Sequence, residues 1–136
     1  MKPTKQVIVM RTDLNMRKGK MIAQGSHASM AFLTRSGGFF QSSLEDHRAF
    51  HNEQMTNLEE AEEWMKNSFT KICLQVGSEA ELDELYNKAQ EAGLTVHLII
   101  DNGLTEFNGV KTKTCLCIGP HYSEKIDPIT SHLRLL

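Results

Sequence analysis

The sequence predicts an α/β fold with three layers, α/β/α, around a mixed four-stranded sheet whose fourth strand is antiparallel. Apolar stretches of strand length alternate with stretches of helical periodicity. The third and fourth strand-like stretches are separated only by residues 101–111, which is short for a helical crossover. The 136 residues contain no repeat and no linker, so we expect one domain over residues 1–136.

The chain starts with a strand and a helix. Gln6–Arg11 is a nearly continuous apolar run, as expected for a strand that is covered on both faces. Lys18–Leu33 has helical spacing. We expect four apolar residues to form the buried side of this helix: Ile22, Ala23, Met30 and Leu33.

The middle of the chain shows a weaker pattern. Residues 39–57 mix phenylalanines and histidines without a clean period, so they predict neither a helix nor a strand. Asn57 is expected to cap a helix over Leu58–Lys66, whose acidic first turn suits the helix dipole.

The second half predicts three strands and two helices. Thr70–Val76, Leu94–Ile100 and Thr112–Ile118 are expected to be strands, the last one stopped by Pro120. Because the first two of these follow helices, both should run parallel to the first strand of the chain. The helix signals are a capping box at Ser78 and Glu81, an apolar stripe at Leu82, Leu85, Tyr86 and Ala89, a terminating Gly93, and a short helix over Ser123–Ile129.

Composition excludes several classes of protein. No apolar run approaches the ~20 residues that span a bilayer, and no signal peptide precedes the first strand, so we expect no membrane partner. The three cysteines, Cys73, Cys115 and Cys117, lie in apolar runs. This usage predicts buried, reduced thiols in the cytoplasm.

Charge is distributed unevenly. The net charge is −2, yet residues 1–20 hold six basic residues against Asp13, and residues 45–63 hold seven acidic residues against Arg48. A basic pole of this kind would suit a phosphate backbone. Chance clustering on a solvated surface is the alternative.

Polar residues are expected to meet at one edge of the sheet. Lys20, Gln24 and His27 stand at i, i+4 and i+7, so they share one face of the first helix. Ligands of open α/β sheets bind outside the carboxyl ends of the parallel strands. The residues that follow these strands, or begin the antiparallel one, should collect at that edge: Arg11, Asp13, Asp101, Thr112 and Lys113.

Three ordered segments carry a family resemblance. Lys18–Ala28 has the pattern Lys-Gly-Lys-x-x-Ala-Gln-x-x-His-Ala, and Asp101–Thr105 and Thr112–Pro120 follow it. Together they resemble the signature of type-2 peptidyl-tRNA hydrolases over nearly the whole chain, with Thr34–Asn67 as the least similar part, which looks like an insertion. The resemblance implies the three-layer fold and a cytoplasmic homodimer without cofactor or DNA partner. It also implies a peptidyl-tRNA substrate, cleaved at the ester between the peptide and the 3′-terminal ribose.

The chemistry of such an ester suggests roles for the matching residues. Hydrolysis needs a positioned water, stabilisation of the oxyanion and a proton for the ribose oxygen. No serine or cysteine lies in a nucleophile motif, so we expect direct attack by water. Lys20 is expected to stabilise the oxyanion or to bind phosphate, and Asp101 to orient the water or to pair with Lys20. Gln24 and His27 would orient the substrate or relay protons, with His27 as a candidate general base.

Hydroxyls and cations complete the expected site. Thr105 and Thr112 are expected to hold water or the substrate carbonyl, and Thr114 is an alternative to Thr112, which lies nearer the loop. The cations expected to contact tRNA are Arg11, Arg17, Lys18 and Lys113. Structural roles are the alternatives: a solvent-exposed Lys20, a packed His27 and an Asp101 that only forms a turn.

Two departures from the family pattern leave other functions open. Gly25 stands where the family often has cysteine, and Glu106 where a neutral amide is common. The insertion and Glu106 favour, as one competing function, a non-catalytic RNA-binding adaptor of the same fold. An aminoacyl-tRNA editing deacylase is the other, because it would use much the same active-site residues. His47 and His51 have the i, i+4 spacing of metal ligands, but two ligands alone are a weak signal, and we expect no metal.

Overall fold

The computed structural model describes residues 2–34, 57–104 and 106–136. The predictions for Thr105, for residues 39–56 and for His47 and His51 lie outside these residues. In chain order, the elements of the described part are β1 (Thr4–Arg11), α1 (Lys18–Thr34), α4 (Leu58–Lys66), β2 (Lys71–Val76), α5 (Glu79–Glu91), β3 (Val96–Asp101), β4 (Thr112–Tyr122), α6 (Ser123–Thr130) and β5 (Arg134–Leu135).

The sheet has the strand order β3-β4-β1-β2-β5. β1 pairs with β2 in parallel, and β4 is antiparallel to both of its neighbours, β1 and β3. β3 therefore runs in the same direction as β1 and β2. The predicted mixed sheet with an antiparallel fourth strand is confirmed.

A fifth strand corrects the expected number of four. β5 pairs antiparallel with the edge of β2 through Leu74 with Leu135 and Gln75 with Arg134. Two residues are too few to show a periodicity, so the sequence contains no local signal for this strand. It forms because β2 offers unpaired backbone groups at its edge.

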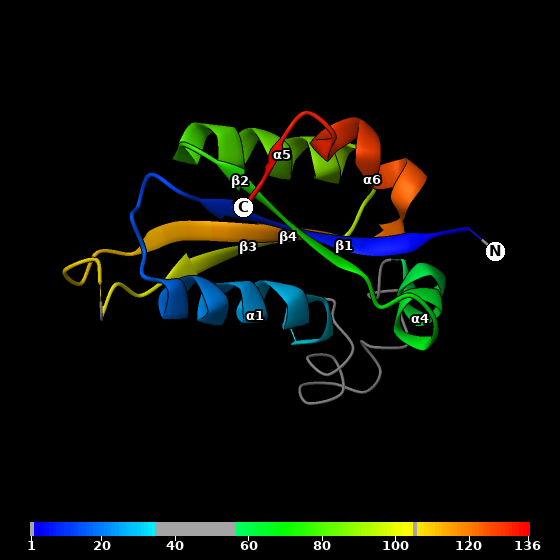
Figure 1. Cartoon of the computed structure of the whole chain (residues 1–136), viewed down its shortest axis with the longest axis horizontal. Helices are drawn as coiled ribbons and strands as arrows, with labels where there is room; N and C mark the ends of the chain where they lie inside the picture. Colours follow the sequence, from blue (N-terminus) through cyan, green and yellow to red (C-terminus); the bar gives the residue numbers. More distant parts are fainter. Residues whose placement is uncertain (1, 35–56, 105) are drawn as a thin grey trace.

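Helices cover both faces of the sheet, as predicted (Figure 1). α1 and α4 lie on one face, and α5 and α6 lie on the other. One core cluster packs β-strand residues such as Val9 and Leu116 against Leu82 and Leu85 of α5. A second cluster packs Ile8 and Cys117 against Ala28 and Ala31 of α1. No helix in the described part of the chain is long and apolar enough to cross a membrane.

The buried side of α1 differs from the prediction. Its buried residues are Gln24, Ala28, Ala31 and Phe32. Ile22 and Met30 are instead 71% and 56% exposed, Ala23 is exposed, and Leu33 is half-buried. Apolar residues occur all round this helix, so periodicity alone could not select its buried side. The small alanines allow close approach to the sheet, and Gln24 finds polar partners there.

The helix ends follow local signals in one case and not in the other. Ser78 caps α5 as predicted, because its Oγ accepts the amide N–H of Glu81 at 3.1 Å, and Gly93 follows the helix with φ of +74°. α4 has the predicted bounds, but Asn57 makes no side-chain cap. Its Oδ1 accepts the amide N–H and hydroxyl of Thr95 instead, each at 2.9 Å, so the capping prediction was wrong.

The prediction that Pro120 stops β4 was also wrong, because the strand continues to Tyr122. The pairing of β4 with β1 shifts register between Lys5 and Val7, beside this proline. An irregularity of this kind accommodates a residue that has no amide N–H to donate.

Candidate active site

An ion pair joins the first turn of α1 to the end of β3. Lys20 Nζ lies 2.9 Å from Asp101 Oδ1, and both side chains are only 15% exposed. The two residues are 81 positions apart in the chain. Their contact confirms that the two motif segments converge, and it excludes a solvent-exposed Lys20.

Asp101 is held by three N–H donors. Besides Lys20, the side-chain amide of Gln24 donates to Oδ1 at 3.2 Å and the backbone amide of Gly103 donates to Oδ2 at 2.8 Å. Burial opposes the charged form, but the hydrogen bonds from Lys20, Gly103 and Gln24 outweigh it and hold the pKa of Asp101 below its ordinary value. The carboxylate is therefore ionised at neutral pH, and it also makes the turn contact expected of an Asp-Asn-Gly sequence.

Thr114, and not Thr112, supplies the hydroxyl of this cluster. The buried Thr114 hydroxyl donates to Gln24 Oε1 at 2.6 Å, which leaves the Gln24 amide directed at Asp101. The Thr112 hydroxyl donates to the carbonyl of Val110 at 2.9 Å. Thr112 does lie opposite Asp101 in the sheet, but its hydroxyl bonds the loop. The geometry therefore favours Thr114 for the hydroxyl role, and the role of Thr112 stays a prediction.

A bulge in β4 explains why Thr114 reaches Gln24. Ile99 pairs with Cys115 and Ile100 with Lys113, so Thr114 is an extra residue on this strand. Thr114 bonds the Gln24 side chain, and the neighbouring Cys115 Sγ donates to the Gln24 carbonyl at 3.4 Å. Two consecutive residues thus face α1, which simple alternation does not predict.

His27 lies outside this cluster. It is exposed, and no hydrogen bond to its ring is found among the described residues. On α1, His27 is turned away from the side where Gln24 and Ala28 meet the sheet. Of the three residues predicted to share one face, Lys20 and Gln24 therefore lie in the polar cluster, and His27 lies on the exposed side of the helix. The alternative of a packed histidine between helix and sheet is excluded as well.

Two of the predicted tRNA-binding cations face α5 rather than α1. The guanidinium of Arg11 is nearly buried and holds both carboxylate oxygens of Asp13, at 3.0 and 2.7 Å, with Glu79 at 3.6 Å. Lys113 Nζ lies 3.1 Å from Asp83 Oδ1. The structure therefore does not bring Arg11 and Lys113 to the Lys20–Asp101 pair.

Four of the six basic residues within residues 1–20 pair closely with carboxylates, and two of these carboxylates lie near the end of the chain. Lys2 pairs with Glu124 at 2.9 Å and Lys5 with Asp127 at 2.6 Å. Arg17 is 91% exposed, with only a loose contact of 3.9 Å to Glu106, and Lys18 is also exposed. The cationic surface near the candidate site is thus at the start of α1.

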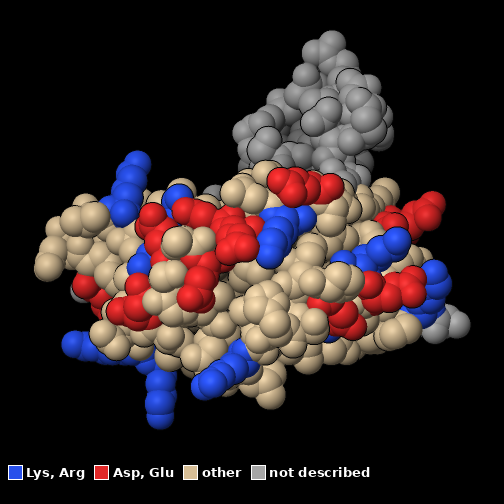
Figure 2. All heavy atoms as spheres, turned by 90° about the horizontal axis from the view of Figure 1, so that it is seen from above, with Lys and Arg blue, Asp and Glu red and all other residues tan. Residues whose placement is uncertain are grey.

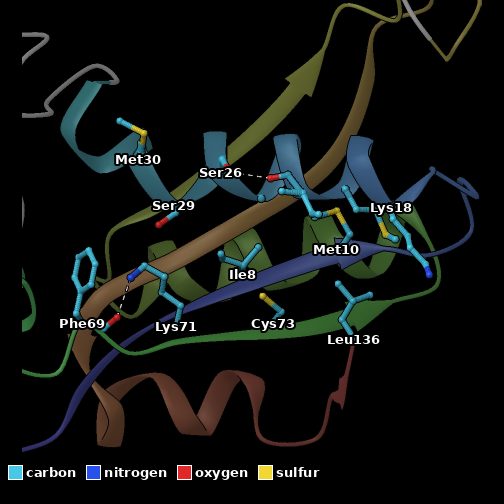
Figure 3. A pocket seen from close by; sticks show the side chains of 13 residues that line it. Ile8, Met10, Lys18, Ser26, Ser29, Met30, Phe69, Lys71, Cys73 and Leu136 are labelled. Atoms are coloured by element: carbon cyan, nitrogen blue, oxygen red, sulfur yellow. Dashed lines mark hydrogen bonds between the residues drawn. The ribbon is translucent and has the colours of Figure 1, made fainter.

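An apolar groove follows the flank of α1 that lies away from the Lys20–Asp101 pair (Figure 3). It has a volume of about 690 Å³ and lies between α1 and strands β1 and β2, with Lys18 toward one end and Phe69 and Lys71 toward the other. Cys73 lies in it and is exposed, which corrects the expectation that all three cysteines are buried. The remaining lining includes Ile8, Met10, Met21, Ile22, Gly25, Met30 and Leu136.

No metal centre is found in the part of the chain that the structure describes, and neither of its two buried cysteines is reactive. No group of three His, Cys, Asp or Glu side chains there could hold a metal ion. Burial raises the pKa of the Cys115 thiol to about 12 and raises that of Cys117 as well. Both thiols are therefore protonated at neutral pH and are poor nucleophiles.

Sequence comparison identifies the family. A family model described as peptidyl-tRNA hydrolase PTH2 matches residues 4–136. The chain belongs to this family. Membership of the PTH2 family assigns the reaction class, hydrolysis of a carboxylic ester, and peptidyl-tRNA as the class of substrate.

Individual relatives agree with this assignment. The peptidyl-tRNA hydrolases of Methanocaldococcus jannaschii and Methanothermobacter thermautotrophicus are each 39% identical to the chain, over 97% of it and 99% of their own length. A probable peptidyl-tRNA hydrolase 2 of Dictyostelium discoideum is 37% identical over 96% of the chain and 54% of its own length. A solved protein of unknown function from Agrobacterium tumefaciens shares the fold, with a TM-score of 0.51 at 10% identity and coverage of 100% and 99%.

Proposed function

We propose that the Lys20–Asp101 pair, held by Gln24 and Thr114, is the centre where this PTH2-family chain hydrolyses the ester of peptidyl-tRNA. The observation that carries the proposal is the 2.9 Å ion pair of two poorly exposed side chains at the carboxyl edge of the sheet. Burying a charged pair costs free energy through desolvation, and paired titratable groups with perturbed pKa values cluster at functional sites.

The reaction we propose is direct attack by water. The water oxygen forms a bond to the ester carbonyl carbon, and negative charge develops on the carbonyl oxygen. Lys20 supplies positive charge beside that oxygen. The bond from the carbonyl carbon to the ribose oxygen then breaks. The attacking water gives up one proton and the ribose oxygen gains one, so the products are a free peptide with a carboxyl end and tRNA with a free ribose hydroxyl.

Asp101 acts as a fixed carboxylate in this scheme. Its lowered pKa makes it a weak base, so its role is to hold Lys20 and to accept a hydrogen bond from the attacking water. Gln24 and Thr114 keep it in place. Roles for His27, Thr105 and Thr112 in orienting water or moving protons stay predictions.

We further propose that tRNA approaches from the start of α1. Arg17 and Lys18 are exposed there and are suited to phosphate groups. The opposite face is unsuited to a polyanion: α5 carries carboxylates from Glu79 to Glu91 against the single Lys88, and they gather on the face seen in Figure 2. Contacts from Arg11 and Lys113 stay predictions with less support, because both are engaged by carboxylates.

The proposed activity is tested by single-turnover release of a labelled N-acetyl-aminoacyl group from tRNA, measured beside unblocked aminoacyl-tRNA. We expect rapid release from the blocked substrate only, since that substrate resembles peptidyl-tRNA. Preferential cleavage of the unblocked substrate would identify an editing deacylase. Binding of tRNA without cleavage of either ester would leave the adaptor function.

Exchanging Glu106 for glutamine is expected to strengthen tRNA binding by roughly 2- to 5-fold at low salt, because it removes a negative charge 3.9 Å from Arg17. Fluorescence anisotropy of labelled tRNA over a salt series measures the effect. Affinity of the unmodified chain should fall as salt rises, since bound cations are released from the phosphates. An affinity that does not change with salt would rule out the phosphate contact.

We also propose a cytoplasmic homodimer that uses the apolar groove. Ile22 and Met30 project from α1 with small residues between them, so two copies of α1 could pack antiparallel in an isologous contact. Antiparallel packing keeps the two Lys18 side chains apart. Sedimentation equilibrium should give a dimer for the unmodified chain and a monomer for Ile22→Glu; an unchanged dimer would exclude this surface.

A further inference from the structure

Two exposed aliphatic side chains stand beside the candidate active site. Leu104 is 83% exposed and Val110 is 62% exposed. Both belong to the segment between β3 and β4, which begins directly after Asp101. Leu104 follows Gly103, whose amide lies 2.8 Å from the Asp101 carboxylate, and consecutive Cα atoms are about 3.8 Å apart. Leu104 is therefore one residue away from a direct contact with the proposed catalytic pair.

Backbone contacts bring Val110 to the same place. Gly103 has φ of +81°, and a Cβ atom there would lie 2.2 Å from the carbonyl oxygen of Val110. The amide of Gly109 also donates to the carbonyl of Gly103 at 2.8 Å. The backbones of Gly109 and Val110 thus lie beside Gly103, so that Leu104 and Val110 both flank Gly103.

The two flanks of the site differ in chemistry. The start of α1 offers Arg17 and Lys18, which suit phosphate groups. The other flank, between β3 and β4, offers Leu104 and Val110, and it meets the first flank where Glu106 lies 3.9 Å from Arg17. The ring of Phe107 continues this second flank toward Lys20, whose Nζ lies 5.7 Å from the ring centroid. The proposed substrate has the same two parts, a polyanionic tRNA and an acyl group that carries an amino-acid side chain.

We propose that Leu104 and Val110 bind the side chain of the peptide residue that is esterified to tRNA. This inference rests on the proposed function of Lys20 and Asp101. Leu104 and Val110 are aliphatic, and the aromatic Phe107 near them is half-buried against the core on the α1 side and beside Lys20. The exposed part of this surface therefore favours packing against an apolar side chain over stacking on a nucleobase. The enzyme should then prefer a bulky apolar residue at the ester over glycine.

The test compares N-acetyl-leucyl and N-acetyl-glycyl esters on the same tRNA. We expect kcat/KM of the unmodified chain to favour the leucyl ester by roughly 10-fold, the low end of the discrimination that an apolar contact provides, because Leu104 and Val110 are exposed. Leu104→Ser should bring this ratio close to 1, chiefly by slowing the leucyl ester. Leu104→Met should keep the preference, because its side chain is also apolar and of similar size.

Ile100→Ser is the matched control. Ile100 is 52% exposed and lies in the same region, but its neighbour Ile99 packs toward α1, so alternation directs Ile100 to the other face. This variant should keep the ratio of the unmodified chain. A thermal unfolding curve for every variant shows whether it is folded. If Leu104→Ser folds poorly, Val110→Ser serves in its place and should likewise bring the ratio of the two esters closer to 1.

Three results would contradict the proposed binding of the acyl side chain by Leu104 and Val110 or the function on which it rests. A ratio near 1 in the unmodified chain overturns the proposal. An equal loss on both esters in Leu104→Ser and Val110→Ser overturns it too, and points to a contact with the tRNA 3′ end instead. Absence of cleavage of either ester by the unmodified chain refutes the proposed function itself, which distinguishes that failure from the loss of acyl preference.

Discussion

Lys20→Ala is expected to lower kcat for N-acetyl-aminoacyl-tRNA by about 10²- to 10³-fold, the loss that follows removal of one group that stabilises an oxyanion. The free energy of unfolding should fall by only about 1–3 kcal/mol. Asp101 keeps its hydrogen bonds from Gln24 and Gly103 and remains 15% exposed to water, so the fold can tolerate the loss. Single-turnover kinetics and chemical denaturation measure the two quantities.

Lys88→Ala controls for the loss of a positive charge. Lys88 lies on α5, on the far side of the sheet, and pairs with Glu84 in its own helix. The Lys88→Ala variant should therefore have the kcat of the unmodified chain. A Lys20→Ala protein that keeps its turnover, or one that is unfolded throughout, would contradict the assigned role of Lys20.

Thr114→Val is expected to lower kcat by roughly 10-fold and the free energy of unfolding by about 1–3 kcal/mol. Valine has nearly the same shape but no hydroxyl, so Gln24 Oε1 loses its 2.6 Å hydrogen bond in a buried place. Gln24 can then rotate, and the carboxylate of Asp101 loses a fixed donor. Parallel kinetics and denaturation of the purified variant measure both losses.

Two further variants separate this network from a general effect of packing. Thr114→Ser keeps the hydroxyl and should recover most of the lost turnover. Thr112→Val should cost less than Thr114→Val, because the Thr112 hydroxyl bonds only the Val110 carbonyl among the described residues. A larger loss from Thr112→Val would show that the loop hydroxyl, and not the buried one, serves the reaction.

Predictions from the sequence succeed where the signal lies in neighbouring residues and fail where a distant residue decides. The Ser78 cap, the terminating Gly93 and the helix Leu58–Lys66 are encoded by neighbouring residues, and the structure confirms them. The reciprocal half of the predicted capping box differs, because the Glu81 carboxylate accepts the amide of Gly77. Asn57 fails as a cap because Thr95, which is 38 residues away, takes its side chain. A partner so distant in sequence leaves no trace in a local pattern.

The candidate site also has features that the sequence predicts and features that it does not. The convergence of Lys20 and Asp101 follows from topology alone. Lys20 lies in the first turn of the helix that follows β1, and Asp101 ends β3, so both lie at the carboxyl edge of the sheet. The choice between Thr112 and Thr114 does not, because it depends on a bulge that adds one residue to β4. A bulge shifts which side chains face a helix without changing the hydrophobic pattern that predicts the strand.

The sequence by itself thus determined the order of strands and helices up to α6, the antiparallel fourth strand, and the two segments that meet in the ion pair. Only the tertiary structure decided which side of α1 is buried, which cations are neutralised, and that His27 lies outside the polar cluster. Periodicity reports the spacing of residues along one element. Burial and charge pairing depend on the neighbours that other elements bring, and those neighbours are chosen by packing of the whole chain.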